Sequence, residues 1–217
     1  MIKILDLEDS FPNPRFASKN GLVAIGGDLS PQTLLDAYKM GIFPWYSEGD
    51  PILWWSPDPR MVLYPKDLKI SRSLKKVLKK DKFEVYFNRD FEQVIRNCSK
   101  IPRKGQNGTW ILPEIIEAYK KLYLLGYAQS VETYLDGQLV GGLYGVVIGK
   151  VFFGESMFSR VSDASKVAFV HLVKKLEKEG FHFIDCQVSS NYLANFGAVE
   201  IPRDRFLDEL KVAVTLY

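Results

Sequence analysis

Three polar side chains in the C-terminal part of the chain have types and spacing suited to chemistry: Glu155, Asp185 and Gln187. Glu155 follows an apolar run that begins at Val151, and burying its carboxylate is costly unless it has a partner or a cationic ligand. Asp185 and Gln187 stand two apart in another predicted strand, so their side chains point to the same face. If the two strands are neighbours, two carboxylates and an amide converge on one pocket. The alternative is that Asp185 caps an element or pairs with a buried lysine.

Other catalytic signatures are missing from the sequence. There is no HExxH motif, Cys/His cluster or GxSxG motif, so we expect neither metal catalysis nor a nucleophilic serine. His171 and His182 have no nucleophile signature beside them and are interpreted as structural. Cys98 and Cys186 form neither a CxxC motif nor a disulfide framework, which is typical of the reducing cytoplasm. We expect no membrane span, because no window of about 18 apolar residues exists, and no secretory signal at the N-terminus.

The charge of the chain is concentrated in one stretch. Residues 66–82 contain eight Lys or Arg and two Asp, a net charge of 8 − 2 = +6, whereas the whole chain has +3. Such a run indicates a polyanionic partner that carries phosphates. The alternative is an ordinary solvated helix face. The basic residues that we predict to contact a nucleic acid are Lys66, Lys69, Arg72, Lys75, Lys76, Lys79 and Lys80.

Aromatic residues gather in a second stretch, residues 41–60. It holds three of the four tryptophans and four prolines, so we expect neither a regular helix nor a central strand there. Aromatic rings on proline-stiffened loops offer flat faces on which a base stacks. The alternative is that they fill the joint between two parts of the chain, which we favour for Trp54 and Trp55. For Trp45 both interpretations stay open.

The elements that position these residues follow from periodicity and turn signals. We expect a strand at 22–25 and a helix after Ser30, then the basic helix 72–80, a strand at 83–87 and helices at 91–98 and 114–125. Strands follow within 130–156, with a hairpin at Asp136-Gly137, and then helix 163–179, strand 181–188 and helix 203–214. This order predicts an α+β fold. We expect a small N-terminal α/β domain over residues 1–61 and a second domain over residues 62–217, with a central, mostly antiparallel sheet.

Several blocks of the sequence together resemble one family. They include GIFPW (41–45), WWSPDPR (54–60), GTWI (108–111), GESMFSR (154–160) and IDCQV (184–188), in order along about nine-tenths of the chain. The chain resembles the leucyl/phenylalanyl-tRNA–protein transferases of bacteria. The carboxylates suit a cationic acceptor, and the aromatic and basic stretches suit a donor linked to nucleic acid, so the residues and the resemblance point to the same kind of reaction.

The resemblance implies a function, a fold and partners. The enzyme would move Leu or Phe, and also Met, from aminoacyl-tRNA to the α-amine of proteins that begin with Arg or Lys. That product marks proteins for degradation in the N-degron pathway. The catalytic domain would be similar to the GNAT acetyltransferases. We expect a cytoplasmic monomer that uses no cofactor, because the tRNA ester is already activated.

The resemblance also implies roles for particular residues. Trp45 and Trp110 would border the terminal adenosine, and Glu155 and Asp185 would hold the acceptor's basic side chain and ammonium. Gln187 would receive or relay the amine proton, with Asp185 polarising it, although an amide has almost no basicity near neutral pH and is a better orienting group. The apolar pocket for the donor side chain would be formed by Leu143, Phe152, Met157 and Ile184.

One departure and two rival functions remain. Ser190 and Tyr192 stand where the family usually has Asn and His, so no role is transferred to them. The first rival is an acetyl-CoA-dependent GNAT N-acetyltransferase, against which residues 158–166 lack the glycines of a pyrophosphate-binding loop. The second is a non-catalytic module that binds tRNA, which would bind tightly and in a salt-sensitive way without any transfer.

Overall fold

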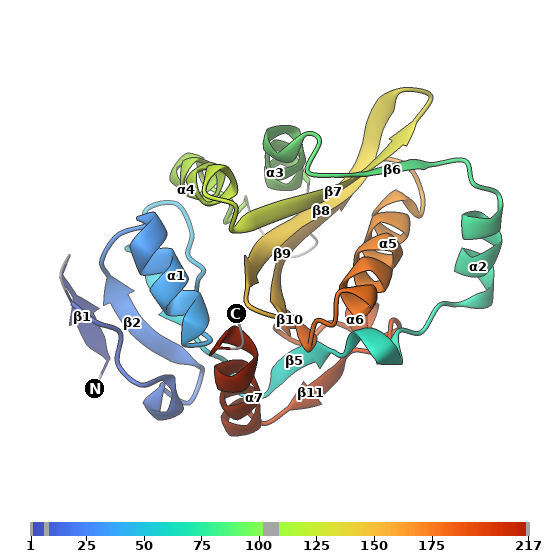
Figure 1. Ribbon diagram of the computed structural model, residues 1–217. Coiled ribbons are helices and arrows are strands. Elements are labelled where there is room, and N and C mark those ends of the chain that lie inside the picture. The colour runs from blue at the N-terminus through green and yellow to red at the C-terminus, as the bar shows by residue number, and fades with distance from the viewer. Residues whose placement is uncertain (1, 7–8, 102–108, 216–217) are drawn as a thin grey trace.

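The computed structural model describes residues 2–6, 9–101 and 109–215, which fold around two β-sheets (Figure 1). The smaller sheet has the strand order β1-β2-β4-β3, and helix α1 (Pro31–Lys39) belongs to the same N-terminal part. Strands β1 and β2 run parallel, and the other neighbours run antiparallel. The four strands are β1 (Lys3–Leu5), β2 (Leu22–Gly26), β3 (Phe43–Pro44) and β4 (Leu53–Trp55).

The larger sheet has seven strands in the order β11-β5-β10-β9-β8-β7-β6. Its one parallel pair is β9·β10, and all other neighbouring strands run antiparallel. The α+β class predicted from the sequence, with a small N-terminal part and a larger, mostly antiparallel sheet, is confirmed. The strands are β5 (Arg60–Leu63), β6 (Glu84–Phe87), β7 (Ala128–Leu135), β8 (Gln138–Ile148), β9 (Val151–Ser159), β10 (Phe183–Gln187) and β11 (Val199–Ile201).

Helices cover both faces of the larger sheet (Figure 1). On one face, α3 (Phe91–Lys100) and α4 (Pro113–Leu124) pack on the sheet, and their apolar core continues into the smaller sheet. On the other face, α5 (Ala164–Lys178) builds a second core, against which α2 (Arg72–Lys79) packs from outside. The remaining helical elements are η1 (Pro14–Phe16), η2 (Pro65–Asp67), α6 (Asn191–Ala194) and α7 (Arg203–Thr215).

Local sequence signals explain where the elements begin and turn. The Ser30 side chain accepts a hydrogen bond from the Thr33 amide, and the Ser71 side chain accepts one from Leu74, so both serines cap the helices that follow them. Asp136 and Gly137 both have positive φ values, 52° and 73°, which is the conformation of the two-residue turn predicted for the β7–β8 hairpin.

The expectation for residues 41–60 was wrong in one respect. Strand β4 lies in the interior of the smaller sheet, between β2 and β3, although we expected no central strand there. The reason is local: Pro51 and Pro57 lie outside β4, and Pro44 lies on the edge strand β3. Trp54 is fully buried within this N-terminal part, where its Nε1 donates to the Gly26 carbonyl at 2.8 Å.

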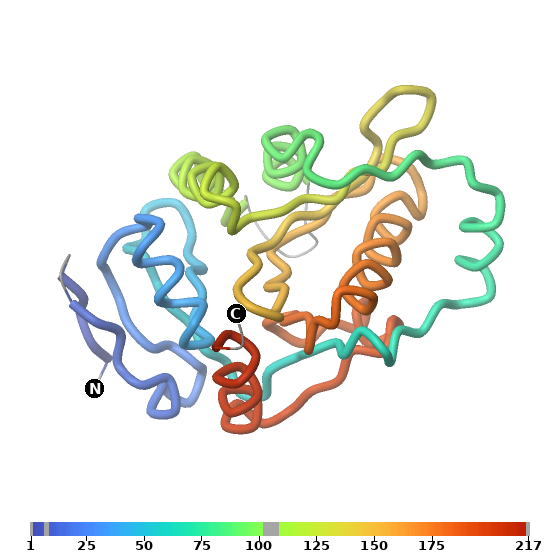
Figure 2. Tube along the Cα trace, in the orientation of Figure 1, coloured from blue at the N-terminus to red at the C-terminus, as the bar shows by residue number. Residues whose placement is uncertain are grey.

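Helix α7 returns the C-terminal end of the chain to the N-terminal part. Figures 1 and 2 both show it between the smaller sheet and β5. Arg15 forms ion pairs with Asp204 and Asp208 of this helix. The boundary that we predicted after residue 61 falls inside β5, a strand of the larger sheet, and the division into 1–61 and 62–217 stays a prediction.

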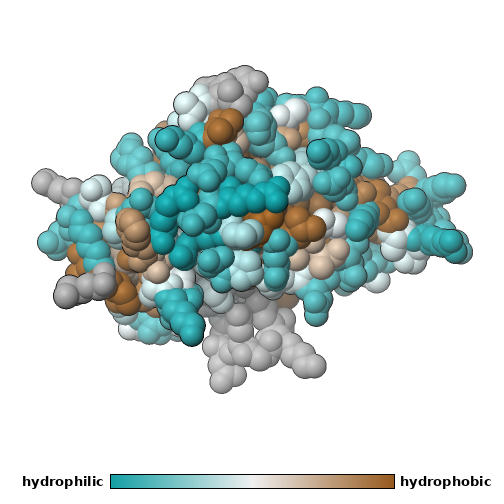
Figure 3. All heavy atoms as spheres, turned by 90° about the horizontal axis from the view of Figure 1, so that it is seen from below, coloured by the Kyte–Doolittle hydropathy of each residue, from teal (hydrophilic) through white to brown (hydrophobic). Residues whose placement is uncertain are grey.

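One face of the molecule is mostly hydrophilic. Figure 3 shows one face, on which hydrophilic residues predominate and hydrophobic ones appear as separate spots. Scattered apolar side chains of this kind need no special explanation. Across the part of the chain that the structure describes, no helix is long and apolar enough to cross a membrane.

Candidate active site

A cavity of about 1040 Å³ opens where β9 and β10 come apart. Every residue predicted from the sequence to bind the donor or acceptor or to take part in the reaction lines it. These residues are Trp45, Trp110, Leu143, Phe152, Glu155, Met157, Ile184, Asp185 and Gln187. The predicted cluster therefore shares one cavity, although its members come from distant parts of the chain.

The cavity arises from the end of a strand pairing. The parallel register of β9 with β10 runs from Val151–Phe183 to Phe153–Asp185, while the strands themselves continue to Ser159 and Gln187. Past that point the two strands leave a gap, and residues that belong to both faces of the sheet reach the same space. The cavity can therefore receive groups from both faces.

The two sides of the cavity differ in chemistry. Phe152 and Ile184 belong to the core beneath α5, and they form an apolar wall together with Leu143 and Met157. Glu155 lies on the opposite face, where its hydrogen-bond partners are side chains of α1 and α4. One side suits an apolar side chain, and the other suits a cationic or proton-donating group.

A β-bulge directs Glu155 into the cavity. Gly145 of β8 pairs with Gly154, but Tyr144 pairs with Ser156, so Glu155 is the extra residue of β9. A bulge of this kind bends a strand and changes the direction of a side chain, and bulges are frequent beside active sites.

Three hydrogen bonds reach the Glu155 carboxyl group. The hydroxyl of Tyr38 donates to Oε1 at 2.6 Å, and the hydroxyl of Tyr119 donates to Oε2 at 3.2 Å. Gln187 Nε2 donates to Oε1 at 2.9 Å. The two tyrosine hydroxyl oxygens are also in contact with each other. Glu155 is thus held by α1, α4 and β10 together.

Burial raises the pKa of Glu155 from 4.5 to about 7. The hydrogen bonds from Tyr38, Tyr119 and Gln187 lower this pKa, and the nearby charge of Asp185 raises it, but desolvation is the largest effect. Burial also holds the pKa values of both tyrosines well above 10, so their hydroxyls stay protonated donors near neutral pH. Glu155 is therefore the group of this cluster that titrates in the neutral range.

Asp185 is fully buried and bound to Arg60 through both oxygens. The Arg60 Nε donates to Oδ1 at 2.8 Å and Nη2 donates to Oδ2 at 2.6 Å. The guanidinium lies between the rings of Phe43 and Phe206, at 4.8 and 4.5 Å from their centroids. Asp185 thus has a buried arginine as its partner, where the alternative reading expected a lysine, and it also lines the same cavity as Glu155 and Gln187. Its carboxylate positions neighbouring groups.

Gln187 connects the two acids. Its backbone N–H donates to Asp185 Oδ1 at 2.9 Å, and its side chain donates to Glu155. Its φ of 63° lies in the left-handed region, where non-glycine residues are uncommon and cluster at functional sites. The register of β10 against β5 shifts between Asp185 and Gln187, which turns the Gln187 side chain toward Glu155.

The two tryptophans line the mouth of the cavity from separate segments. Trp45 follows β3, is 38% exposed, and has its ring centroid 6.3 Å from that of Trp55 in an edge-on arrangement. The Trp55 Nε1 donates to the Trp45 carbonyl at 2.6 Å and fixes the backbone there. Trp110 precedes α4 and is half-buried. Two rings at one cavity suit a planar base.

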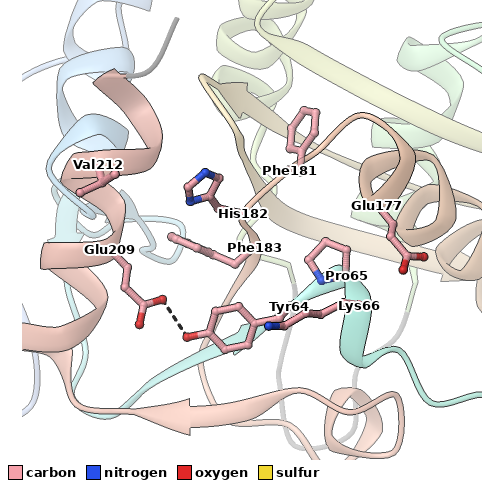
Figure 4. A pocket seen from close by; sticks show the side chains of 9 residues that line it. All are labelled: Tyr64, Pro65, Lys66, Glu177, Phe181, His182, Phe183, Glu209 and Val212. Atoms are coloured by element: carbon pink, nitrogen blue, oxygen red, sulfur yellow. Dashed lines mark hydrogen bonds between the residues drawn. The ribbon is translucent and has the colours of Figure 1, made fainter.

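The predicted basic residues do not line the large cavity. They are exposed on η2, on α2 and beside these elements, and α2 lies on the outer side of α5 (Figure 1). Lys66 alone among them lines a second, smaller cavity of about 480 Å³, where Tyr64 donates a hydrogen bond to Glu209 (Figure 4). Residues 102–108, which include the basic residues Arg103 and Lys104, lie outside the described residues. Both interpretations of the basic stretch, polyanion contact and solvated face, stay open on this geometry.

The two departures from the family pattern, Ser190 and Tyr192, also line the cavity. The Tyr192 hydroxyl lies 3.5 Å from the Ser165 hydroxyl, at the N-terminal end of α5. These residues therefore belong to the wall of the site, and sequence reasoning had given them no role.

Sequence reasoning missed three other residues of the site: Tyr38, Arg60 and Tyr119. Nothing in the sequence indicates that the Tyr38 hydroxyl meets a carboxylate 117 residues away. Arg60 stands 125 residues from Asp185, and Tyr119 stands 36 residues from Glu155. One signal was available in the sequence: a buried Asp185 needs a cationic partner, and Arg60 follows a segment rich in aromatic residues. Across residues 2–6, 9–101 and 109–215, no cluster of three or more His, Cys, Asp or Glu side chains could hold a metal ion.

Comparison with known proteins gives one family. A family model described as "Leucyl/phenylalanyl-tRNA protein transferase" matches residues 62–211, and one for the N-terminal domain of the same proteins matches residues 27–58. A leucyl/phenylalanyl-tRNA–protein transferase of Nitrosospira multiformis is 56% identical over 216 residues, which cover 99% of this chain and 93% of that protein. One of Syntrophobacter fumaroxidans is 57% identical over 197 residues, 91% of this chain and 84% of that protein.

Among solved structures, the chain is similar to an aminoglycoside acetyltransferase from an uncultured soil metagenomic sample. The identity is 16%, the TM-score is 0.39, and the match covers 54% of this chain and 86% of that one. A conserved protein of unknown function from Bacteroides thetaiotaomicron matches at 10% identity and a TM-score of 0.45, over 86% of this chain and 63% of that one. Likenesses this low do not bear on substrate or cofactor.

The Arg60–Asp185 pair gives a prediction about stability. We expect Arg60→Met to lower the free energy of unfolding by about 3–5 kcal/mol, because it leaves the Asp185 carboxylate buried without a partner. The double variant Arg60→Met/Asp185→Asn removes the stranded charge but keeps an acceptor for the Gln187 amide, and should recover much of the stability. Urea unfolding of the three proteins measures this. If Arg60→Met were as stable as the double variant, the prediction would be contradicted.

Glu155 gives a prediction about pH. In the unfolded chain its carboxyl ionises near pH 4.5, but in the folded protein near 7, so wild type loses stability as pH rises through this window. The size of the loss is about 3 kcal/mol, from 1.36 kcal/mol for each pKa unit. Glu155→Gln resembles the protonated acid and does not titrate. We expect the free energy of unfolding of the variant, relative to that of wild type, to be greater at pH 8 than at pH 5, as measured by unfolding at both pH values. An equal difference at both would show that Glu155 does not titrate there.

Proposed function

The chain belongs to the leucyl/phenylalanyl-tRNA–protein transferase family and is an aminoacyltransferase, and from this premise we propose its reaction in detail. It transfers Leu or Phe, and also Met, from aminoacyl-tRNA to the α-amine of proteins that begin with Arg or Lys. The product marks those proteins for degradation through the N-degron pathway. The proposal is carried by a single observation: an apolar wall, two tryptophans and the Glu155 carboxylate meet in one cavity at the β9–β10 gap.

The donor half of the reaction needs position more than chemical activation. The ester of aminoacyl-tRNA is already activated, so the enzyme orients the amine against the carbonyl and stabilises the oxyanion. The apolar wall of Leu143, Phe152, Met157 and Ile184 accepts the donor side chain, and Trp45 and Trp110 border the terminal adenosine. An apolar pocket separates side chains by only about 1–3 kcal/mol for each methylene, which suits an enzyme that takes Leu, Phe and Met.

The acceptor half uses the acidic side of the cavity. Asp185 is neutralised by Arg60, so Glu155 supplies the negative charge that the acceptor's ammonium and basic side chain meet. The role proposed for Asp185 is therefore to position Gln187 by accepting a hydrogen bond from its backbone N–H. Gln187 in turn orients Glu155 and the incoming amine. Its own side chain is not a base near neutral pH, so another group takes the amine's proton.

The rest of the tRNA is proposed to meet the basic stretch. Lys66, Lys69, Arg72, Lys75, Lys76, Lys79 and Lys80 are exposed, and a ligand as large as tRNA reaches beyond the cavity that holds its end. We also propose that the enzyme works as a cytoplasmic monomer without a cofactor, and that residues 1–61 and 62–217 form its N-terminal and catalytic units.

A transfer assay tests the function. tRNA charged with labelled Phe or Leu is offered with peptides that begin with Arg, Lys or Ala and are otherwise identical. We expect label on the Arg and Lys peptides and at least tenfold less on the Ala peptide, because the latter lacks the second positive charge. Acetyl-CoA should neither replace the charged tRNA nor bind. Acetylation of the peptides, or tRNA binding without transfer, would favour one of the two rival functions.

The basic stretch is tested by salt dependence. We expect Lys75→Ala/Lys76→Ala to weaken tRNA binding and to reduce the slope of log K against log salt by about 1 for each phosphate that the variant no longer neutralises. The matched control is Lys19→Ala/Lys211→Ala, which removes two exposed lysines outside the stretch. Binding is measured at several salt concentrations with uncharged tRNA. If both pairs change the slope equally, the stretch is only a solvated face.

A further inference from the structure

Glu155, Tyr38 and Tyr119 form a closed cluster at the acidic side of the cavity. Three contacts join them: Tyr38 to Oε1 at 2.6 Å, Tyr119 to Oε2 at 3.2 Å, and one hydroxyl to the other. Tyr38 and Tyr119 are fully buried, whereas Glu155 borders the cavity. The function assigned above uses Glu155 only as a negative charge and gives the two hydroxyls no part.

A count of hydrogens shows what this cluster can hold. Each tyrosine hydroxyl has one hydrogen to donate, and an ionised carboxylate has none. Two hydrogens therefore serve three contacts while Glu155 is charged. When Glu155 is protonated, three hydrogens serve three contacts: Tyr38 donates to Oε1, Oε2 donates to Tyr119, and Tyr119 donates to Tyr38. The cluster thus has a place for one additional proton.

The surrounding groups leave Glu155 as the member that ionises. From β10, Asp185 is paired with Arg60 of β5, so the two together are neutral. From the same strand, Gln187 donates to Oε1 and carries no charge. On the α4 side, Tyr46 bonds Glu114, and burial raises the pKa of Tyr46 above its ordinary value. The ring of Tyr144 on β8 packs edge-on against Tyr119.

We propose that the Glu155 carboxylate is the base that takes the proton from the acceptor's α-ammonium, and that Tyr38 and Tyr119 orient this carboxylate and favour its ionised form by donating hydrogen bonds to it. The inference rests on the proposed function. Among the described residues, only the Tyr119 hydroxyl donates a hydrogen bond to Glu155 Oε2. The second lone pair of this oxygen can therefore accept the ammonium N–H.

The step balances in protons and bonds. The ammonium gives one proton to Glu155, and the freed amine nitrogen bonds the ester carbonyl carbon. As the carbon–oxygen bond to the ribose breaks, the nitrogen's second proton goes to the ribose oxygen. The products are an amide, a free ribose hydroxyl and protonated Glu155, which returns its proton to water. A carboxyl group whose pKa is raised to about 7 by desolvation is matched to this exchange near neutral pH.

This role makes a specific prediction for kcat/KM with an Arg-starting peptide. The productive encounter needs Glu155 ionised and the peptide amine protonated, so the profile is a bell. Its acid limb follows the ionisation of Glu155. Its alkaline limb follows the loss of a proton from the peptide ammonium, whose pKa is about 7.7–8.0. An enzyme without a base would use only the neutral amine, and its profile would rise to a plateau. Deacylation of the tRNA without enzyme is measured in parallel and subtracted.

The tyrosines supply the sharper test. Tyr119→Phe and Tyr38→Phe each remove a donor that lowers the pKa of Glu155, so we expect the acid limb to move to higher pH in both variants. The alkaline limb should stay, because the peptide is unchanged. Tyr86→Phe is the matched control: it removes a hydroxyl that bonds Glu84 on the edge strand β6, and its profile should equal that of wild type.

Glu155→Gln completes the test. We expect kcat/KM at the optimum to fall about 10²–10⁴-fold, the range for general base catalysis, and the bell to become a rise to a plateau. A bell retained in Glu155→Gln, or acid limbs of Tyr119→Phe and Tyr38→Phe that match Tyr86→Phe, would overturn the inference. If wild type transfers no amino acid at any pH, it is the proposed function that fails instead.

Discussion

Strands β9 and β10 pair in parallel only as far as Phe153 and Asp185, and the cavity exists because both strands continue past that point. A continued ladder would fill the gap with backbone hydrogen bonds. Its absence allows an apolar wall on the α5 face and a carboxylate on the other face to border one space. That arrangement suits the reaction proposed here, between a donor with an apolar side chain and a cationic acceptor, because the two sides of the cavity differ in chemistry.

Side chains take over where the backbone pairing ends. Gln187, in a left-handed conformation, bridges from Asp185 to Glu155 across the gap. Asp185 is fixed by Arg60, whose guanidinium lies between Phe43 of the smaller sheet and a ring of α7. One buried ion pair thus joins both sheets and the C-terminal helix to the wall of the cavity. Buried pairs are weak evidence for stability, but removing one partner is strongly destabilising, so the geometry around the gap is tightly specified.

The half-buried Glu155 is the opposite case, a group kept at a cost to stability. Glu155 is desolvated and lacks a cationic partner among the described residues, and its pKa of about 7 records the free energy lost when it ionises. Tyr38 and Tyr119 reduce that cost with hydrogen bonds but do not remove it. Local rules of folding are broken most often at functional sites. A carboxylate without a salt-bridge partner can bind a substrate there, whereas a salt-bridged carboxylate is already occupied.

The sequence alone indicated helices α1–α5 and α7, most of the longer strands and the β7–β8 hairpin, because each of these depends on neighbours within a few residues. It also identified nine of the residues that line the cavity, through side-chain type, alternation on strands and the likeness to a family. It did not indicate the central position of β4, which depends on prolines lying just outside a three-residue strand. Only the tertiary structure showed that Asp185 forms an ion pair with Arg60 and that Glu155 accepts hydrogen bonds from two tyrosines. These partners are 36 to 125 residues apart, and a contact over such separations leaves no trace in local pattern because packing of whole elements decides it.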